Sequence, residues 1–261
     1  MRLIQHKKEA YWFYRFLSLV YDRVNPLFWT VQMRTETLEL AQLGDRALDV
    51  IDVGAGTGFT TEGIAAHTDP SRLVMLDQSP HQLARSERRP ALTGVARVLG
   101  DAEALPFADE SFDRYVSAGS VEYWPDPQCA VHEAARVLRP GGVAVLIGPL
   151  PPRAPGAAWL ARAWMLFPEE SEYRAWFASA GFEDVVVRHI APDWHRGDAY
   201  AVAVAGVRGE RPPPAHAPAE RLDEPMTGRR RLRFAVRFAA GSVAGLVFVP
   251  IAAVLSILRR R

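Results

Sequence analysis

The chain has 261 residues, of which 49% are hydrophobic and 23% charged, so it holds one large domain, or one domain with appendages, and is not disordered as a whole. Its formal charge of +1 combines a mildly acidic body with a basic tail, because residues 209–261 carry ten arginines against four acidic residues. A nucleic-acid-binding protein carries its basic surface on the folded domain, so no nucleic-acid partner is expected. The single cysteine, Cys129, excludes an internal disulfide, and no Cys/His cluster has the spacing of a zinc site, so no metal is expected.

Residues 1–35 are rich in aromatic side chains and hold eight of the chain's 26 aromatics. Residues 8–24 form a predicted helix that ends near a proline, because the residue before a proline is biased away from the helical region. Charges interrupt the apolar run, which argues against a secretory signal, and the segment is neither Ser-rich nor acid-poor, as a transit peptide would be. We expect either a helix that packs on the edge of the core or a lid beside a hydrophobic substrate. In the second case Trp12 and Tyr14 would contact that substrate.

Residues 36–208 alternate between short apolar runs and helical patterns. Such alternation predicts an α/β fold, a doubly wound and mostly parallel sheet with helices on both faces. Seven strands are expected, at 47–53, 72–77, 96–100, 112–118, 142–148, 184–190 and 199–207. No helix pattern separates the last two, so we expect them to form an antiparallel hairpin. Helical patterns lie at 128–138 and 170–180.

The C-terminal part reads as a Pro/Arg-rich linker, 209–237, followed by 21 uncharged residues, 238–258. At about 1.5 Å per residue such a helix spans roughly 30 Å, the hydrocarbon thickness of a bilayer. We therefore expect a transmembrane helix in contact with membrane lipid, in preference to a buried core helix. Five arginines precede it and three follow, which predicts a single-pass tail anchor in the cell membrane with the preceding domain, residues 36–208, cytoplasmic. Gly241 and Gly245 form a GxxxG pair that would suit a homodimer.

The strongest motif is Asp52-Val-Gly-Ala-Gly-Thr-Gly58, at the end of the first predicted strand. Glycines there let the backbone turn tightly and approach a ligand where any Cβ would clash. Position 59 is Phe, so the dinucleotide pattern G-x-G-x-x-G is not met, and no Gly-Lys-Ser/Thr follows, which excludes a P-loop. The motif indicates a ligand loop, although such a stretch also occurs as a plain turn.

Two carboxylates follow the next two predicted strands. Asp77 ends the second strand, where a carboxylate accepts hydrogen bonds from both hydroxyls of a ribose. Asp101 ends the third strand, where a carboxylate meets the exocyclic amine of an adenine. Each Asp also has an ordinary interpretation as a strand-end cap or turn former. Together with the glycine loop, they indicate a nucleoside-binding site at the carboxyl edge of the sheet.

The segments DVGAGTG, LDQS, GDAEALPF, SFDRYVSAGSVEYW and RVLRPGG resemble those of class I S-adenosylmethionine-dependent methyltransferases. KKEAYWFYRFLSLVYDRVNP, DQSPHQLA, DRYVSAGSVEYWPDPQ and WMLFP narrow the resemblance to the 2-methyl-6-prenyl-1,4-benzoquinol methyltransferases of plastoquinone and tocopherol synthesis. The similarity runs from Lys7 to about Arg208. The chain departs from the plant members in lacking a transit peptide, in having His195 where they usually have Tyr, and in a shorter loop at 197–199.

The resemblance implies a C-methyltransferase that uses S-adenosylmethionine to methylate the ring of a prenylated benzoquinol. It also implies which residues contact that cofactor: Asp52, Gly54, Ala55, Gly56, Gly58, Asp77, Gln78, Asp101, Ala102, Glu103 and Ser117. The alternatives are a demethylmenaquinone or ubiquinone-pathway C-methyltransferase, which shares the cofactor motifs, and a non-catalytic protein that binds S-adenosylmethionine.

Transfer to a ring carbon requires a base that helps a phenol lose its proton. A phenol titrates near 10 and a histidine near 6.5, a gap of roughly 5 kcal/mol, so proton removal should be concerted with attack. Acceptor-side candidates follow the fourth predicted strand, with Ser120 first and Glu122 as the preferred base; His195 is the second candidate base. We expect substrate contacts from aromatic residues that could equally be plain core: Tyr123, Trp124 and Trp194.

Overall fold

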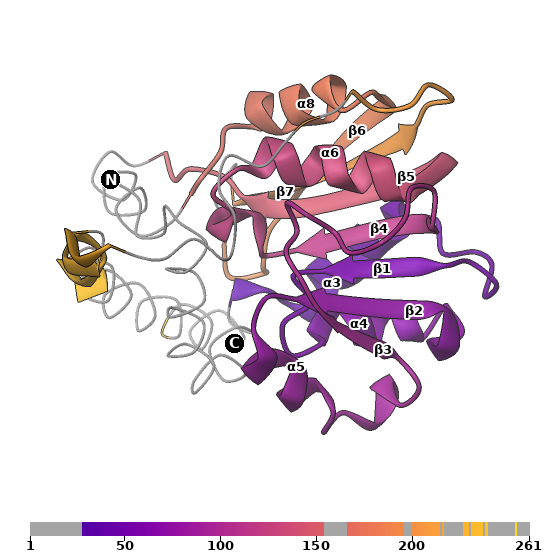
Figure 1. Ribbon diagram of the computed structural model, residues 1–261, viewed down its shortest axis with the longest axis horizontal. Coiled ribbons are helices and arrows are strands. Elements are labelled where there is room, and N and C mark those ends of the chain that lie inside the picture. The colour runs from indigo at the N-terminus through magenta and orange to yellow at the C-terminus, as the bar shows by residue number, and fades with distance from the viewer. Residues whose placement is uncertain are drawn as a thin grey trace.

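The structure, a computed structural model, describes residues 28–153, 166–195, 200–214, 216, 227–229, 231–236, 238–239 and 254. Its centre is one seven-stranded sheet with the strand order β3-β2-β1-β4-β5-β7-β6 (Figure 1). The strands are β1 (Val50–Val53), β2 (Leu73–Asp77), β3 (Ala96–Leu99), β4 (Phe112–Ala118), β5 (Leu138–Pro149), β6 (Phe182–Ile190) and β7 (Ala201–Arg208). All seven predicted strands are confirmed, with ends shifted by a few residues.

The first five strands run parallel, and β7 pairs antiparallel with both β5 and β6. The sheet is therefore mostly parallel, and the predicted antiparallel pairing of the last two strands is confirmed. The described helices are α3 (Val31–Leu40), α4 (Phe59–Ala65), α5 (Pro80–Ser86), α6 (Pro127–Val137) and α8 (Glu170–Ser179), with short 3-10 turns η1 (Pro70–Arg72), η2 (Pro90–Leu92) and η3 (Val121–Tyr123).

Helices cover both faces of the sheet, so the central strands are apolar on both sides. Alternate residues of β1 show this directly, because Val50 belongs to one buried cluster and Ile51 to the other. The cluster with Ile51 contains α6 and α8, which lie together on one side of the sheet in Figure 1. The cluster with Val50 contains residues of α3, α4 and α5. The two packed layers leave the carboxyl ends of β1 to β4 open for a site.

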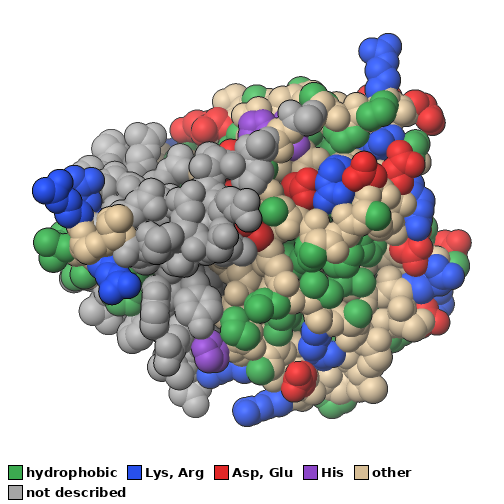
Figure 2. All heavy atoms as spheres, viewed as in Figure 1, with side chains coloured by type: hydrophobic (Ala, Val, Ile, Leu, Met, Phe, Trp, Pro, Cys, Tyr) green, Lys and Arg blue, Asp and Glu red, His purple; other side chains and the backbone are tan. Residues whose placement is uncertain are grey.

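The mixed surface charge is visible on the face drawn in Figure 2. Acidic and basic side chains are interspersed there around apolar ones, over the part of the chain that the structure describes. A surface of this kind has no strong single-sign field on that face to attract a polyanion.

The predicted transmembrane helix is corrected. Among the described residues, no helix is long and apolar enough to cross a membrane. The prediction relied on the hydropathy of 238–258 alone. Most of that range, including Gly241 and Gly245 of the expected dimer contact, lies outside the described residues, as do residues 1–27 with Trp12 and Tyr14.

Gly148 generates a test of the packing between β5 and the helices above it. A Cβ at this position would overlap Tyr173 Oη and Val121 Cγ1. Tyr173 is fully buried and its hydroxyl donates to the Pro149 carbonyl at 3.1 Å, so it has no room to move away. We expect Gly148→Ala to lower the free energy of unfolding by about 1–3 kcal/mol in urea denaturation. Gly44→Ala, which meets no atom within 4 Å, is the control, and an equal loss there would contradict the packing argument.

Candidate active site

The glycine loop follows β1 and leads into α4. Gly54, Gly56 and Gly58 have φ values of +70°, +57° and +88°, a region in which L side chains are strained. A Cβ on Gly54 would come within 2.5 Å of the Cβ of Ser120, which follows β4. The loop therefore needs glycine for two reasons, its backbone conformation and the close approach of the turn after β4.

Asp77 fastens this loop to the end of β2. Its Oδ2 accepts the N–H of Gly56 and its Oδ1 accepts the N–H of Ser79, both at 2.8 Å. Burial raises the pKa of the Asp77 carboxyl to about 6, although the two backbone hydrogen bonds act in the opposite direction. Each carboxylate oxygen has a second lone pair, so the side chain can still accept hydrogen bonds from a ligand.

The carboxyl edge of the sheet holds a cleft among the described residues. It is lined by Gly54, Leu76, Asp77, Gln78, Gly100, Asp101, Ala102, Glu103, Ser120, Tyr123, Trp124 and Pro125. Six of these are residues that the sequence resemblance assigned to the cofactor, and two are the expected aromatic substrate contacts. The structure thus brings the ends of β1, β2, β3 and β4 together at one site, as the strand-end positions predicted. Leu76, Gly100 and Pro125 were not predicted, because they carry no ligand chemistry that a sequence would reveal.

Five predicted cofactor residues do not line the cleft: Ala55, Gly56 and Gly58 lie in the glycine loop, and Asp52 and Ser117 lie behind it. Asp52 faces α4, where the hydroxyl of Thr61 donates to it at 2.6 Å, and burial raises the pKa of this carboxyl to about 7. Ser117 donates to the Val53 carbonyl at 2.7 Å and lies 2.7 Å from the Ser120 hydroxyl. Neither lines the cleft, so both act through the loops that they support.

The carboxylates after β3 are already engaged in local structure. The N–H of Glu103 donates to Asp101 Oδ1 at 3.0 Å, which is the turn-forming arrangement that the sequence left open. Glu103 is 2% exposed, and its Oε1 accepts the N–H of Asp126 at 2.8 Å. Asp101 therefore shapes the turn that lines the cleft, and Glu103 ties that turn to the start of α6.

Glu122 lies on η3, directly before Tyr123 of the cleft. Burial raises the pKa of its carboxyl to about 7, and its Oε2 makes no hydrogen bond among the described residues. A buried carboxyl with spare acceptor capacity and a pKa near neutrality is suited to take up a proton.

Tyr200 links Glu122 to the second candidate base. Burial, and then the charge of nearby Glu122, raise the pKa of Tyr200 well above its usual value. The Tyr200 ring lies 5.1 Å from the ring of His195 and 5.6 Å from that of Trp194, between centroids. Its hydroxyl donates to the Phe28 carbonyl at 2.9 Å. The structure therefore places His195 and Trp194 against a tyrosine that the sequence did not single out, within reach of the charge of Glu122.

Comparisons with known proteins agree with this geometry. The family described as "Methyltransferase domain" matches residues 51–146. The chain is 49% identical, over 261 residues, to the chloroplastic 2-methyl-6-phytyl-1,4-hydroquinone methyltransferase 1 of Oryza sativa subsp. japonica, covering 96% of this chain and 78% of that protein. It is 48% identical, over 263 residues, to the chloroplastic 2-methyl-6-phytyl-1,4-hydroquinone methyltransferase of Arabidopsis thaliana, covering 96% of this chain and 76% of that one.

A solved structure extends the comparison to the fold alone. Geranyl diphosphate C-methyltransferase from Streptomyces coelicolor has a TM-score of 0.58 at 16% identity, covering 68% of this chain and 78% of that chain. At this identity the likeness supports the arrangement of sheet and helices and carries no statement about the substrate.

The expected location is corrected by two of these findings. We predicted a cell-membrane tail anchor with a cytoplasmic catalytic domain, whereas the similar plant proteins are chloroplastic by name. In addition, none of the described helices could span a membrane. The prediction was wrong because it rested on hydropathy and flanking arginines alone.

Asp77 gives the first test of the cleft. We expect Asp77→Ala to weaken binding of S-adenosylmethionine by about 1.5–3 kcal/mol in isothermal titration calorimetry, the range for hydrogen bonds to a charged group. Affinity of the unmodified protein should also fall as the pH drops below about 6, because the protonated carboxyl accepts ribose hydroxyls less well. Glu87→Ala, an exposed carboxylate at the end of α5, is the control, and equal losses in both variants would remove Asp77 from the site.

Proposed function

The chain belongs to the family of 2-methyl-6-phytyl-1,4-hydroquinone methyltransferases, and we propose that it methylates a ring carbon of a 2-methyl-6-prenyl-1,4-benzoquinol. The protein is an S-adenosylmethionine-dependent methyltransferase, and its relatives act in quinone and tocopherol biosynthesis. The observation that carries the proposal is the pair of side chains that the turn η3 brings to the cleft. The turn η3 supplies both Tyr123, which lines the cleft, and Glu122, a buried carboxyl with acceptor capacity left.

The cleft fits S-adenosylmethionine at the level of its own residues. Asp77 would accept the ribose hydroxyls, and the backbone of the glycine loop would lie against the ligand where Gly54 leaves no side chain in the way. Asp101 and Ala102 would contact the adenine, with Gln78 beside the ribose. When bound, the cofactor supplies an electrophilic methyl group on a sulfonium. The remaining work of this chain is to hold the acceptor ring and manage its proton.

Positioning is the larger part of that work. Holding two reactants at attack distance can supply about 7–11 kcal/mol of a barrier. Tyr123 and Trp124 would form an apolar wall beside the cofactor and the quinol, and their burial, at 8% exposed each, would exclude water from the reacting atoms. Trp194 would contact the quinol from the side of Tyr200.

Glu122 is proposed as the base. Its pKa of about 7 lies roughly three units below that of a phenol, so full proton transfer before attack would cost about 4 kcal/mol. Proton removal is therefore concerted with formation of the new carbon–carbon bond, at which the phenolic oxygen becomes acidic. His195 is the alternative base, and Tyr200 would keep its ring at the acceptor side.

The substrate assignment is tested by a transfer assay with radiolabelled S-adenosylmethionine. We expect labelled methyl to reach 2-methyl-6-prenyl-1,4-benzoquinol with a higher kcat/KM than demethylmenaquinol. A higher kcat/KM for demethylmenaquinol would overturn the substrate assignment, whereas the assignment of methyltransferase activity would stand. Turnover of neither, despite cofactor binding, would leave a non-catalytic binding protein.

Glu122→Gln tests the base. The amide keeps the shape of the side chain but cannot take up a proton, so kcat should fall about 10²–10⁴-fold while both dissociation constants stay nearly unchanged. The kcat of the unmodified enzyme should rise with pH through about 7, as Glu122 ionises, and the variant should lack this rise. His195→Gln is the matched comparison. If it alone abolishes turnover and the pH dependence, the base is His195.

A further inference from the structure

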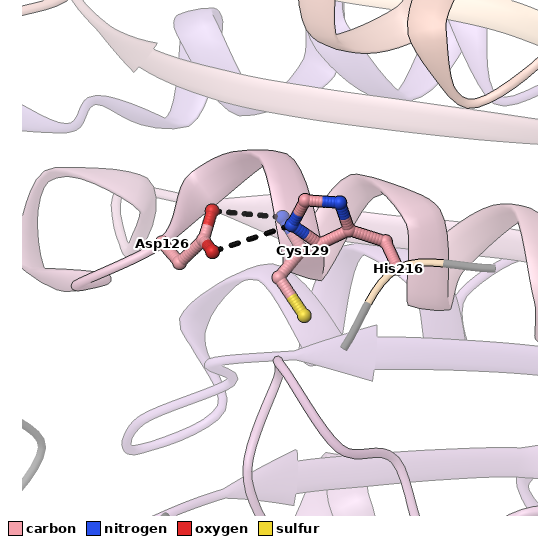
Figure 3. A group of neighbouring side chains, drawn as sticks. All are labelled: Asp126, Cys129 and His216. Carbon is pink, nitrogen blue, oxygen red and sulfur yellow. Dashed lines mark hydrogen bonds and ion pairs between the residues drawn. The ribbon is translucent and has the colours of Figure 1, made fainter. Parts of the chain in front are cut away.

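A second group of side chains with ligand chemistry lies outside the cleft, where α6 begins. Asp126 caps α6, Cys129 lies in its first turn, and His216 comes from the Pro-rich segment 90 positions after Asp126 (Figure 3). One ligand atom of each lies within 4.8 Å of the others. Sequence spacing did not reveal this group, because only the fold brings His216 to α6.

Asp126 and His216 form a contact whose length also suits two ligands of one ion. Asp126 Oδ2 and His216 Nε2 are 3.4 Å apart, as an ion pair or a long hydrogen bond. In a tetrahedral zinc site, bonds of about 2.05 Å place the oxygen and nitrogen ligands roughly 3.3 Å apart. The other carboxylate oxygen, Oδ1, accepts the N–H of Cys129 at 3.1 Å, which fixes the carboxylate so that Oδ2 faces the histidine.

The donor set selects among metals. A thiol, an imidazole and a carboxylate are the three ligand types of protein zinc sites, whereas magnesium and calcium prefer oxygen ligands throughout. Cys129 is fully buried in the first turn of α6, and its thiol donates to the carbonyl of Glu103 at 3.4 Å. Zinc would replace that thiol proton, and the helix N-terminus would favour the resulting thiolate. A sulfur ligand would be about 3.6 Å from the zinc-bound nitrogen and oxygen, so the Cys129 side chain would have to rotate from the Glu103 carbonyl toward Asp126 and His216.

Neighbouring groups hold these side chains in place. The His216 ring stacks on His132, with centroids 4.9 Å apart and planes at 23°. His132 Nδ1 donates to the carbonyl of Pro214 at 3.0 Å, which anchors the segment that carries His216. On the other side, the N–H of Asp126 donates to Glu103 of the cofactor cleft. Supports of this type orient metal ligands in known sites.

We propose that Asp126, Cys129 and His216 form a zinc site, with water as the fourth ligand, that fastens the Pro-rich segment to the methyltransferase domain. Because the ion would be bound by the folded chain alone, its binding free energy would stabilise the fold. Glu103 accepts the N–H of Asp126 and also lines the cofactor cleft, so the two sites are adjacent. The zinc proposal does not depend on the substrate proposed above.

The experiment uses the full chain without a histidine tag, stripped of metal with a chelator. Titration with zinc against a chromophoric chelator should show one tight site per chain. Cobalt in its place should give the near-ultraviolet absorption of a thiolate–cobalt bond. Cys129→Ser should abolish that absorption, and His216→Gln should weaken zinc binding at least 10-fold. His67→Gln, at an exposed histidine after α4, is the control and should change neither.

Two outcomes would overturn the proposal. One is the absence of stoichiometric zinc binding by the stripped full chain, which would leave Asp126 and His216 as an ordinary ion pair. The other is a zinc affinity that is the same in His216→Gln as in the unmodified chain. Because Cys129 is buried and its substitution could disturb folding, His216→Gln decides the matter, provided that the variant keeps its circular dichroism spectrum and its affinity for S-adenosylmethionine.

Discussion

The site depends on one buried carboxylate, that of Asp77, which joins the glycine loop to the turn after β2 at the edge of the sheet. It accepts the N–H groups of Gly56 and Ser79, while the N–H of Gly54 donates to the carbonyl of Leu76 beside it at 2.8 Å. Without Asp77, buried N–H groups of the loop would lose their partners, at a cost comparable to the hydrogen bonds themselves. The glycine loop thus keeps its left-handed conformation because β2 ends in an acid.

The acceptor side of the site is formed by residues at the end of β4 and directly after it, which contact the same glycine loop. Ser120 packs so closely on Gly54 that no side chain fits between them, and Ser117 donates to the carbonyl that precedes the loop. The turn η3 follows at once, with Glu122 buried and Tyr123 lining the cleft. Cofactor loop and acceptor side therefore cannot move independently, which suits a reaction whose barrier is lowered by positioning.

Much of this was predictable from the sequence, because strand–helix alternation and the strand-end positions of Asp77 and Asp101 are local patterns. What local patterns could not predict depends on packing between distant segments. The charge of Glu122 reaches Tyr200 only because β7, which follows Tyr200, pairs with β5. His216 reaches α6 in the same way, across 90 positions of chain. The membrane span predicted from hydropathy at 238–258 is not found among the helices of the described residues.

The central claim, that the glycine loop and Asp77 form the cofactor site, is tested most directly by mapping a bound ligand on the backbone. Amide chemical shifts of the isotope-labelled full chain would be recorded with increasing S-adenosylhomocysteine, the product form of the cofactor. The account predicts the largest changes at Gly54, Gly56, Gln78 and Ala102, on the four-strand edge of the cleft. Unchanged shifts at these amides, with changes gathered on α8 and β6 instead, would contradict it.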